Sequence, residues 1–179
     1  MTLAYVFWHW SDGPAPSYGD RLVAFHRALG AHPPRGFRSS RSFAVSGARW
    51  LPRAAAFEDW YLIDDFAALG ALNEAAISGA RREPHDSVAA LAGGGAGGLY
   101  ALKAGDPGEV ATAWWFSKPA GTTYETFFGR LLPLAKERGA ALWQRQMVLG
   151  PAPEFCLRSP REAAPPPELR ALAVACRPV

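Results

Sequence analysis

Residues 3–18, LAYVFWHWSDGPAPSY, are the stretch that decides the fold, because their pattern returns 106 residues later. The aromatic and β-branched run is typical of a strand, and a Gly/Pro loop and a capped helix start follow it. Under this shift three residue types coincide in matching frames: Trp114 with Trp8, Ser117 with Ser11, and Tyr124 with Tyr18. The sequence therefore predicts an internal duplication.

The rest of the first copy predicts the element order β-α-β-β-α-β. Hydrophobic periodicity and cap residues indicate strands at 3–10, 37–46, 57–64 and 99–104, and helices at 17–30 and 65–78. Asp86 is expected to cap a short turn that ends near Ala92. The glycine run at 93–98 fits G-x-G-x-x-G, but a helical turn precedes it and a strand follows it. Because a dinucleotide site needs the opposite order, the run is interpreted as a flexible connector.

The second copy is predicted to be degenerate toward its end. Thr122 and Glu125 form a capping box before a helical stripe, and a shift of 104 residues aligns the next strand with 41–45. In that strand Arg145, Met147 and Leu149 correspond to Arg41, Phe43 and Val45. A strand at 154–159 follows, and 165–179 has room for a shortened helix and a last strand. We expect two halves, residues 1–106 and 107–179, in one compact unit.

Each βαββαβ half makes an antiparallel sheet that helices cover on one face only, so its other face must be buried against the twin half. The predicted fold class is α+β, with two ferredoxin-like halves packed sheet to sheet as an α+β barrel. In this order of elements, from Leu3 to about Ser159, the chain resembles the ferredoxin-like dimeric α+β barrel superfamily. That superfamily includes antibiotic-biosynthesis monooxygenases, stress-responsive barrel proteins and chlorite dismutase-like haem proteins. The resemblance rests on topology and the internal repeat, so it carries over no catalytic residue.

Composition excludes several classes of protein. The chain is 49% hydrophobic and 20% charged, as in ordinary globular domains. Its net charge is only +3 and no basic run exceeds Arg81-Arg82, which argues against a nucleic-acid partner. The longest uncharged stretch, 87–102, holds five glycines and is too short to span a membrane. Because the start lacks the features of a secretory signal, Cys156 and Cys176 are expected to be reduced thiols in a cytoplasmic protein of bacterial type.

Aromatic residues are 12% of the chain, and several are expected to line a pocket between the two halves. The predicted ligand-binding tryptophans all lie on predicted strands: Trp8, Trp60, Trp114, Trp115 and Trp143. Arg41 and Arg145 share a strand face with apolar residues and are expected to hold a carboxylate or phenolate at the barrel mouth. Simple core packing of the rings and pairing of each arginine with a neighbouring acid are the alternatives.

His9 is the predicted catalytic residue, a general base in cofactor-independent oxidation or isomerisation of an aromatic compound. The expected ligand is a small, flat, aromatic or amphipathic molecule. The four histidines show no metal-binding spacing, and no metal or cofactor is predicted. One alternative is a haem protein in which His9 or His85 is the axial ligand. Another is a non-catalytic module that self-associates, and a homodimer is a further expected partner.

Overall fold

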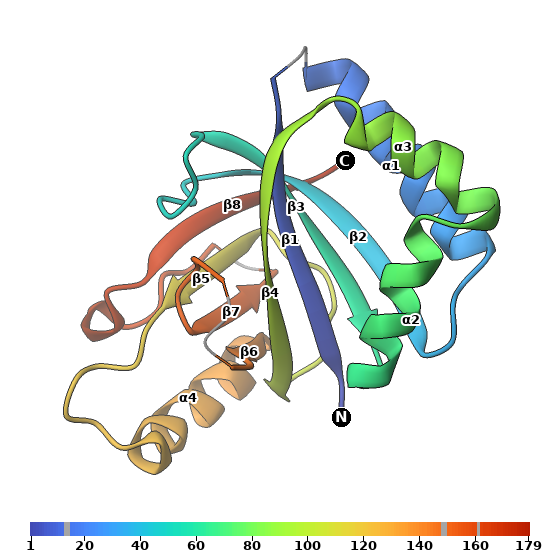
Figure 1. Ribbon diagram of the computed structural model, residues 1–179. Coiled ribbons are helices and arrows are strands. Elements are labelled where there is room, and N and C mark those ends of the chain that lie inside the picture. Colours follow the sequence, from blue (N-terminus) through green and yellow to red (C-terminus); the bar gives the residue numbers. More distant parts are fainter. Residues whose placement is uncertain (13–14, 148–149, 161) are drawn as a thin grey trace.

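The computed structural model describes residues 1–12, 15–147, 150–160 and 162–179. Within these residues eight strands form a closed antiparallel barrel, with helices on its outside (Figure 1). The strands are β1 (Leu3–Ser11), β2 (Phe37–Ser46), β3 (Ala55–Ile63), β4 (Ala92–Ala104), β5 (Thr112–Phe116), β6 (Ala141–Arg145), β7 (Phe155–Ser159) and β8 (Leu172–Pro178). The helices are α1 (Ala15–Ala31), α2 (Phe66–Ala76), α3 (Arg82–Ala89) and α4 (Tyr124–Arg138), with 3-10 turns at Gly79–Arg81 and Pro167–Leu169.

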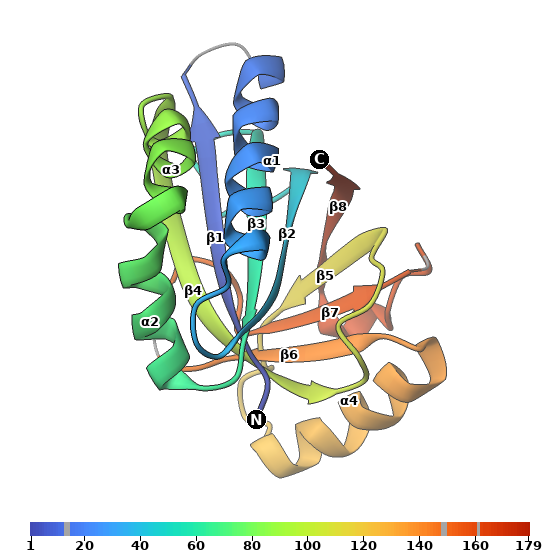
Figure 2. The same ribbon diagram turned by 90° about the vertical axis from the view of Figure 1, so that its right-hand side faces the viewer.

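The barrel consists of two sets of four strands with the same internal order. Around the barrel the strands run β1-β3-β2-β8-β5-β7-β6-β4, so each set places its fourth strand beside its first and its third beside its second. The pairs β2–β8 and β4–β6 join the sets. Helices α1, α2 and α3 cover the first set, and α4 lies against the second (Figure 2). The predicted α+β barrel is confirmed, whereas the duplication and its boundary at residues 106 and 107 stay predictions.

The shift of 106 residues does not preserve the face of the sheet. Trp8 is buried in the barrel interior, whereas Trp114 packs on the outer side with the residues beneath α4. Trp115 occupies the interior instead, so an offset of 107 matches the side chains of β1 and β5. In the same way Tyr18 is fully buried, while Tyr124 is 48% exposed at the first residue of α4. Neighbouring strand residues point to opposite faces, and a shift wrong by one therefore exchanges inside and outside.

Other predicted elements need smaller corrections. The sixth strand ends at Arg145, and Met147 is exposed with a φ of 60°, so it does not continue the strand; Leu149 lies outside the described residues. Thr123, one residue after the expected Thr122, caps α4 by accepting a hydrogen bond from the backbone N–H of Thr126. Asp86 lies within α3 and does not start it. Asp65 caps α2 as predicted. Among the described residues, no helix is long and apolar enough to cross a membrane.

The glycine run is part of strand β4, so its interpretation as a flexible connector was wrong. It pairs with β1 from Gly94 to Gly98, the register shifts at Gly93, and the rings of Phe7 and Tyr5 lie across it. A Cβ at Gly97 would lie 2.9 Å from the Tyr5 ring, and one at Gly95 would overlap the Phe7 ring. Glycine is required here because the aromatic side chains of β1 occupy the space that side chains on β4 would need.

Substitution of Gly95 by alanine is therefore expected to lower the free energy of unfolding by about 1–3 kcal/mol, because Phe7 must move. Gly129 in α4 is the matched control, since nothing lies within 4 Å of a Cβ added there. Gly129→Ala should be neutral or stabilising by about 0.5–1 kcal/mol, as for alanine in an exposed helix interior. Urea unfolding measures the free energy of unfolding of both variants. Equal stability of the Gly95 variant and the wild type would contradict the close approach.

Candidate functional site

Aromatic rings pack the interior of the barrel. Trp8 and Trp115 are fully buried, and their ring centroids lie 5.5 Å apart. Trp60 and Trp143 pack edge to face at 5.2 Å, and the ring of Tyr100 lies 5.4 Å from that of Trp115. Trp8 and Trp115 thus contribute packing to the core and line neither of the two hollows described below. The expected enclosed chamber between the halves is replaced by a filled core with a hollow at one end.

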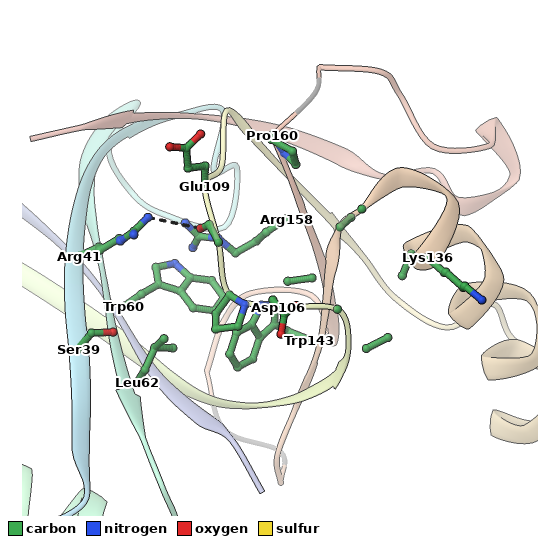
Figure 3. A pocket seen from close by; sticks show the side chains of 18 of the residues that line it. Ser39, Arg41, Trp60, Leu62, Asp106, Glu109, Lys136, Trp143, Arg158 and Pro160 are labelled. Atoms are coloured by element: carbon green, nitrogen blue, oxygen red, sulfur yellow. Dashed lines mark hydrogen bonds between the residues drawn. The ribbon is translucent and has the colours of Figure 1, made fainter.

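This hollow, the barrel-mouth pocket, has a volume of about 800 Å³ and lies among β2, β3, β6, β7, the segment 104–109 and α4 (Figure 3). It brings together three of the predicted ligand-binding residues: Arg41, Trp60 and Trp143. Two others lie elsewhere. Arg145 donates from Nη1 to the backbone carbonyls of Gly150 and Ala152, and Trp114 is on the outer face of the sheet. Arg41 is exposed and its Nη1 lies 3.4 Å from the Gly108 carbonyl oxygen.

A buried ion pair lies at the floor of the barrel-mouth pocket. Arg158 donates from Nη1 to Oε1 of Glu58 over 3.2 Å, and the Glu58 side chain is fully buried. Two indole N–H groups also donate to this carboxylate, Trp8 over 2.7 Å and Trp60 over 2.6 Å. The Arg158 guanidinium stacks on the ring of Trp60 at 4.0 Å from the centroid. A charged pair inside an aromatic core is tolerated only with such partners.

The predicted catalytic residue lies in a second hollow. His9 follows Trp8 on β1 and therefore faces the opposite side of the sheet, toward the helices. There it lines the helix-side pocket, a hollow of about 710 Å³ between the outer face of β1 and β3 and the helices α1, α2 and α3. The structure does not bring His9 together with the tryptophans, contrary to the expectation of a single site.

His9 is the centre of a hydrogen-bonded chain of buried side chains. Its Nδ1 lies 2.6 Å from the hydroxyl of Tyr18 on α1, and its Nε2 lies 3.1 Å from Oδ2 of Asp59 on β3. Tyr61 donates its hydroxyl to the same Oδ2 over 2.8 Å. Nε2 of His26 lies 3.3 Å from that oxygen, an ion-pair distance without the alignment of a hydrogen bond. Oδ1 of Asp59 is buried and receives no hydrogen bond from the described residues.

The partners of His9 determine its tautomer. An ionised carboxylate can only accept, so Nε2 carries the proton that Asp59 receives, and Nδ1 of the neutral ring accepts from Tyr18. Burial alone would raise the pKa of Asp59, but the electrostatic attraction and hydrogen bonding of the His9 and His26 imidazoles outweigh it, and the pKa lies well below its usual value. Burial and the negative charge of Asp59 raise the pKa of Tyr18 to about 12. Tyr18 is therefore a protonated phenol that donates to His9.

The acids that organise both hollows were not predicted from the sequence. Glu58 and Asp59 are consecutive residues within the apolar strand AAFEDWYLI, and both are buried. Two acids in succession on a strand point to opposite faces, so one serves the barrel interior and the other the helix side. This pair was the available signal, because an acid inside an apolar strand needs a buried partner. Arg158 in the short strand FCLRS was a second signal of the same kind.

The described residues of the helix-side pocket do not fit a haem. Both ring nitrogens of His9 are already occupied by Tyr18 and Asp59, and Nδ1 of His26 lies 2.7 Å from Oγ of Ser40. His85 lines the helix-side pocket with only its Nδ1 engaged, by Asp86. Among the described residues, the lining of that pocket contains no arginine or lysine to receive the propionates of a haem. The predicted axial ligands His9 and His85 therefore give the described helix-side pocket neither a free, fully buried imidazole nor the cations that a haem needs.

Comparison with known proteins gives similarity of fold. No protein-family model matches the sequence, and no curated protein matches it closely enough to count as a relative. A candidate monooxygenase from Fusobacterium nucleatum subsp. nucleatum aligns over 97% of this chain and 75% of its own, with 9% identity and a TM-score of 0.53.

Two further solved structures align over nearly the whole chain. A candidate chlorite dismutase covers 99% of this chain and 94% of its own, with 12% identity and a TM-score of 0.53. An anthrone oxidase-like protein covers 98% of this chain and 91% of its own, with 10% identity and a TM-score of 0.52. At these identities the likeness concerns the fold. The chain has the fold of the ferredoxin-like dimeric α+β barrel superfamily, with both four-stranded sets of the barrel supplied by one polypeptide.

Proposed function

We propose that the protein binds a small aromatic or amphipathic molecule in the helix-side pocket and catalyses a proton transfer on it, with His9 as the general base. The observation that carries the proposal is the chain of hydrogen bonds from Asp59 through His9 to Tyr18, because all three residues line that pocket. The rest of the lining is mainly aromatic and aliphatic, which suits a flat apolar compound.

The geometry supports a relay in which one proton leaves the substrate. The Tyr18 oxygen takes the proton from an acidic C–H or O–H group of the bound molecule, while the phenol proton passes to Nδ1 of His9 over 2.6 Å. The ring becomes an imidazolium, and the carboxylate of Asp59 stabilises its charge through Nε2. After the transfer the substrate is an anion, the extra proton is on His9, and Tyr18 is again a phenol.

Two reactions of that anion are compatible with the relay. His9 can return the proton at another carbon, which is an isomerisation. Alternatively, a carbanion adds O2 and takes back the proton to give a hydroperoxide, which is a cofactor-independent oxygenation. The likeness in fold to a candidate monooxygenase and to an anthrone oxidase-like protein supports the second reaction. Because Oδ1 of Asp59 lacks a donor among the described residues, an O–H group of the substrate can supply one.

The expected location is the cytoplasm. Cys156 and Cys176 are both buried in the barrel interior and both are free thiols, which suits a reducing compartment. Burial raises the pKa of the Cys176 thiol to about 12, and burial also raises that of Cys156. Both cysteines are therefore protonated and unreactive, and they take no part in the proposed reaction.

Anthrone is the probe for the proposed reaction, because it is a flat aromatic compound with an acidic C–H group. Hydrogen–deuterium exchange at that carbon, followed by NMR without O2, reports the proton transfer, and O2 uptake reports the oxygenation. We expect Tyr18→Phe and His9→Gln to slow exchange by about 10²–10⁴-fold, the usual contribution of a positioned acid or base. Affinity for anthrone should change by less than about tenfold, since both variants keep most of the pocket surface.

Tyr5→Phe is the matched control. Tyr5 also lines the helix-side pocket, but its hydroxyl is not hydrogen-bonded to His9 or Asp59. This variant should exchange anthrone at nearly the wild-type rate. Rates in Tyr18→Phe and His9→Gln equal to that of Tyr5→Phe would refute the relay, and failure of wild-type protein to bind anthrone would remove this substrate class.

A further inference from the structure

We propose that the barrel-mouth pocket is a second binding site, which takes a planar apolar molecule through its carboxylate, and that Arg158 receives that carboxylate. The site is separate from the helix-side pocket, because the two linings have no residue in common. The proposal therefore goes beyond the proposed function and does not depend on it.

The Arg158 guanidinium is buried but only partly satisfied. Its side chain is 9% exposed, and it stacks on Trp60 at 4.0 Å and on Phe43 at 4.7 Å from the ring centroids. A guanidinium has five N–H donors, and Glu58 takes a bond from Nη1 alone. Nε and Nη2 donate to no other described residue, and neither is a fully buried atom, so both are accessible from the hollow that Arg158 lines. An oxygen atom that enters the pocket would supply an acceptor.

Glu58 and the two rings hold the guanidinium ready for a second carboxylate. The negative charge of Glu58 is already shared with the indole N–H groups of Trp8 and Trp60. The stacked rings fix the plane of the guanidinium, so its free edge has a defined direction. Guanidinium groups bind carboxylates through two parallel N–H donors, and a fixed plane lowers the entropy lost on binding.

The remaining lining indicates the rest of the ligand. Trp60, Trp143 and Leu62 give the pocket an apolar, largely aromatic wall, against which a flat ring system can stack (Figure 3). A volume of about 800 Å³ is in the range of pockets for small organic molecules. The Nε1 donor of Trp143 is buried and has no acceptor among the described residues, which leaves one more polar contact for a substituent.

The exposed charges at the rim do not account for a preference for anions. Arg41 and Lys136 are balanced by Asp106 and Glu109, and all four side chains are exposed. In Figure 3 Lys136 extends away from the other labelled residues. Such charges are screened by water and salt, so discrimination between a carboxylate and a neutral group falls to the buried Arg158.

The test compares 2-naphthoate with 2-naphthalenemethanol, which has the same rings and no charge, by calorimetry on the wild-type protein. Naphthoate is expected to bind about 10-fold to 100-fold more tightly, as one charge-assisted hydrogen-bonded pair allows. In ¹H–¹⁵N spectra the indole N–H resonances of Trp60 and Trp143 should shift on binding. These resonances identify the site, because the described lining of the helix-side pocket contains no tryptophan.

Two variants distinguish the effect of the buried Arg158 charge on naphthoate binding from the effect of the exposed charges at the rim. Glu58→Gln/Arg158→Met removes both buried charges, and it should abolish the preference for naphthoate while leaving binding of the alcohol within about threefold. Arg41→Gln removes an exposed charge and should weaken naphthoate binding less than about fivefold. Equal affinities of wild-type protein for the two probes, unshifted indole resonances, or a preference that survives the double substitution would each overturn the proposal. If the double variant does not fold, the two measurements on wild-type protein still decide it.

Discussion

Replacing Asp59 by alanine is expected to lower the free energy of unfolding by about 3–5 kcal/mol, the usual effect of removing one partner from a buried charged pair. The carboxylate is the shared acceptor of His9 and Tyr61 and the counter-charge of His26, all through Oδ2. Without it a hydroxyl and an imidazole N–H are left buried without an acceptor. Urea unfolding at neutral pH measures the change.

An exposed ion pair provides the comparison. Asp12 and Arg53 lie 2.9 Å apart, but their side chains are 63% and 57% exposed. Asp12→Asn should therefore change the free energy of unfolding by less than about 1 kcal/mol. If Asp59→Ala were no more destabilising than Asp12→Asn, the hydrogen-bonded chain of the helix-side pocket would not be an organised unit.

The contribution of Asp59 to the free energy of unfolding should decrease in acid. Its pKa in the folded protein is lowered, despite burial, by electrostatic attraction to the His9 and His26 imidazoles and by their hydrogen bonds. A lowered folded pKa means that the stabilisation is fully present above the unfolded pKa, near 3.8, and is lost as the pH falls toward the folded pKa. The difference in stability between wild-type protein and Asp59→Asn should thus shrink as the pH falls below about 4. A difference that grows in acid would contradict this assignment.

The barrel could be predicted because the hydrophobic patterns that indicate it lie within short, continuous segments of the sequence. The run from Leu3 to Trp10 has two apolar faces, and a strand of that kind must be covered on both sides, here by a packed interior and by helices. The candidate site could be predicted only in part. His9 and Trp8 are neighbours on one strand, and the alternation of side chains already places them on opposite faces. A single chamber containing both was therefore incompatible with the predicted strand.

The partners of these residues could not be found from local pattern. Glu58 and Asp59 meet Trp8 and His9 only through the antiparallel register of β1 and β3, which aligns Trp8 with Glu58. That register depends on contacts 50 residues apart in the sequence. The glycine run poses the same difficulty, because composition suggests flexibility. Its extended pairing becomes intelligible only once the rings of Tyr5 and Phe7 are placed across it.

In the barrel interior, the largest expected effect follows from separating Glu58 and Arg158. Arg158→Met leaves a fully buried carboxylate with two indole donors but no counter-charge, and it should lower the free energy of unfolding by about 3–5 kcal/mol. Glu58→Gln keeps an oxygen acceptor for Trp8 and Trp60 but removes the negative charge. It should therefore cost less, about 2–4 kcal/mol, because Arg158 can still reach water through the barrel-mouth pocket.

The double variant Glu58→Gln/Arg158→Met should be no less stable than Arg158→Met alone, because neither buried charge then remains. The two single effects would exceed the double effect by at least about 2 kcal/mol, which a double-mutant cycle by urea unfolding measures directly. Additive effects would mean that the two charges act independently, in spite of the 3.2 Å contact. Buried ion pairs add little stability by themselves, so the coupling would measure the mutual dependence of the two charges, and the proposed carboxylate site would supply a reason for the pair.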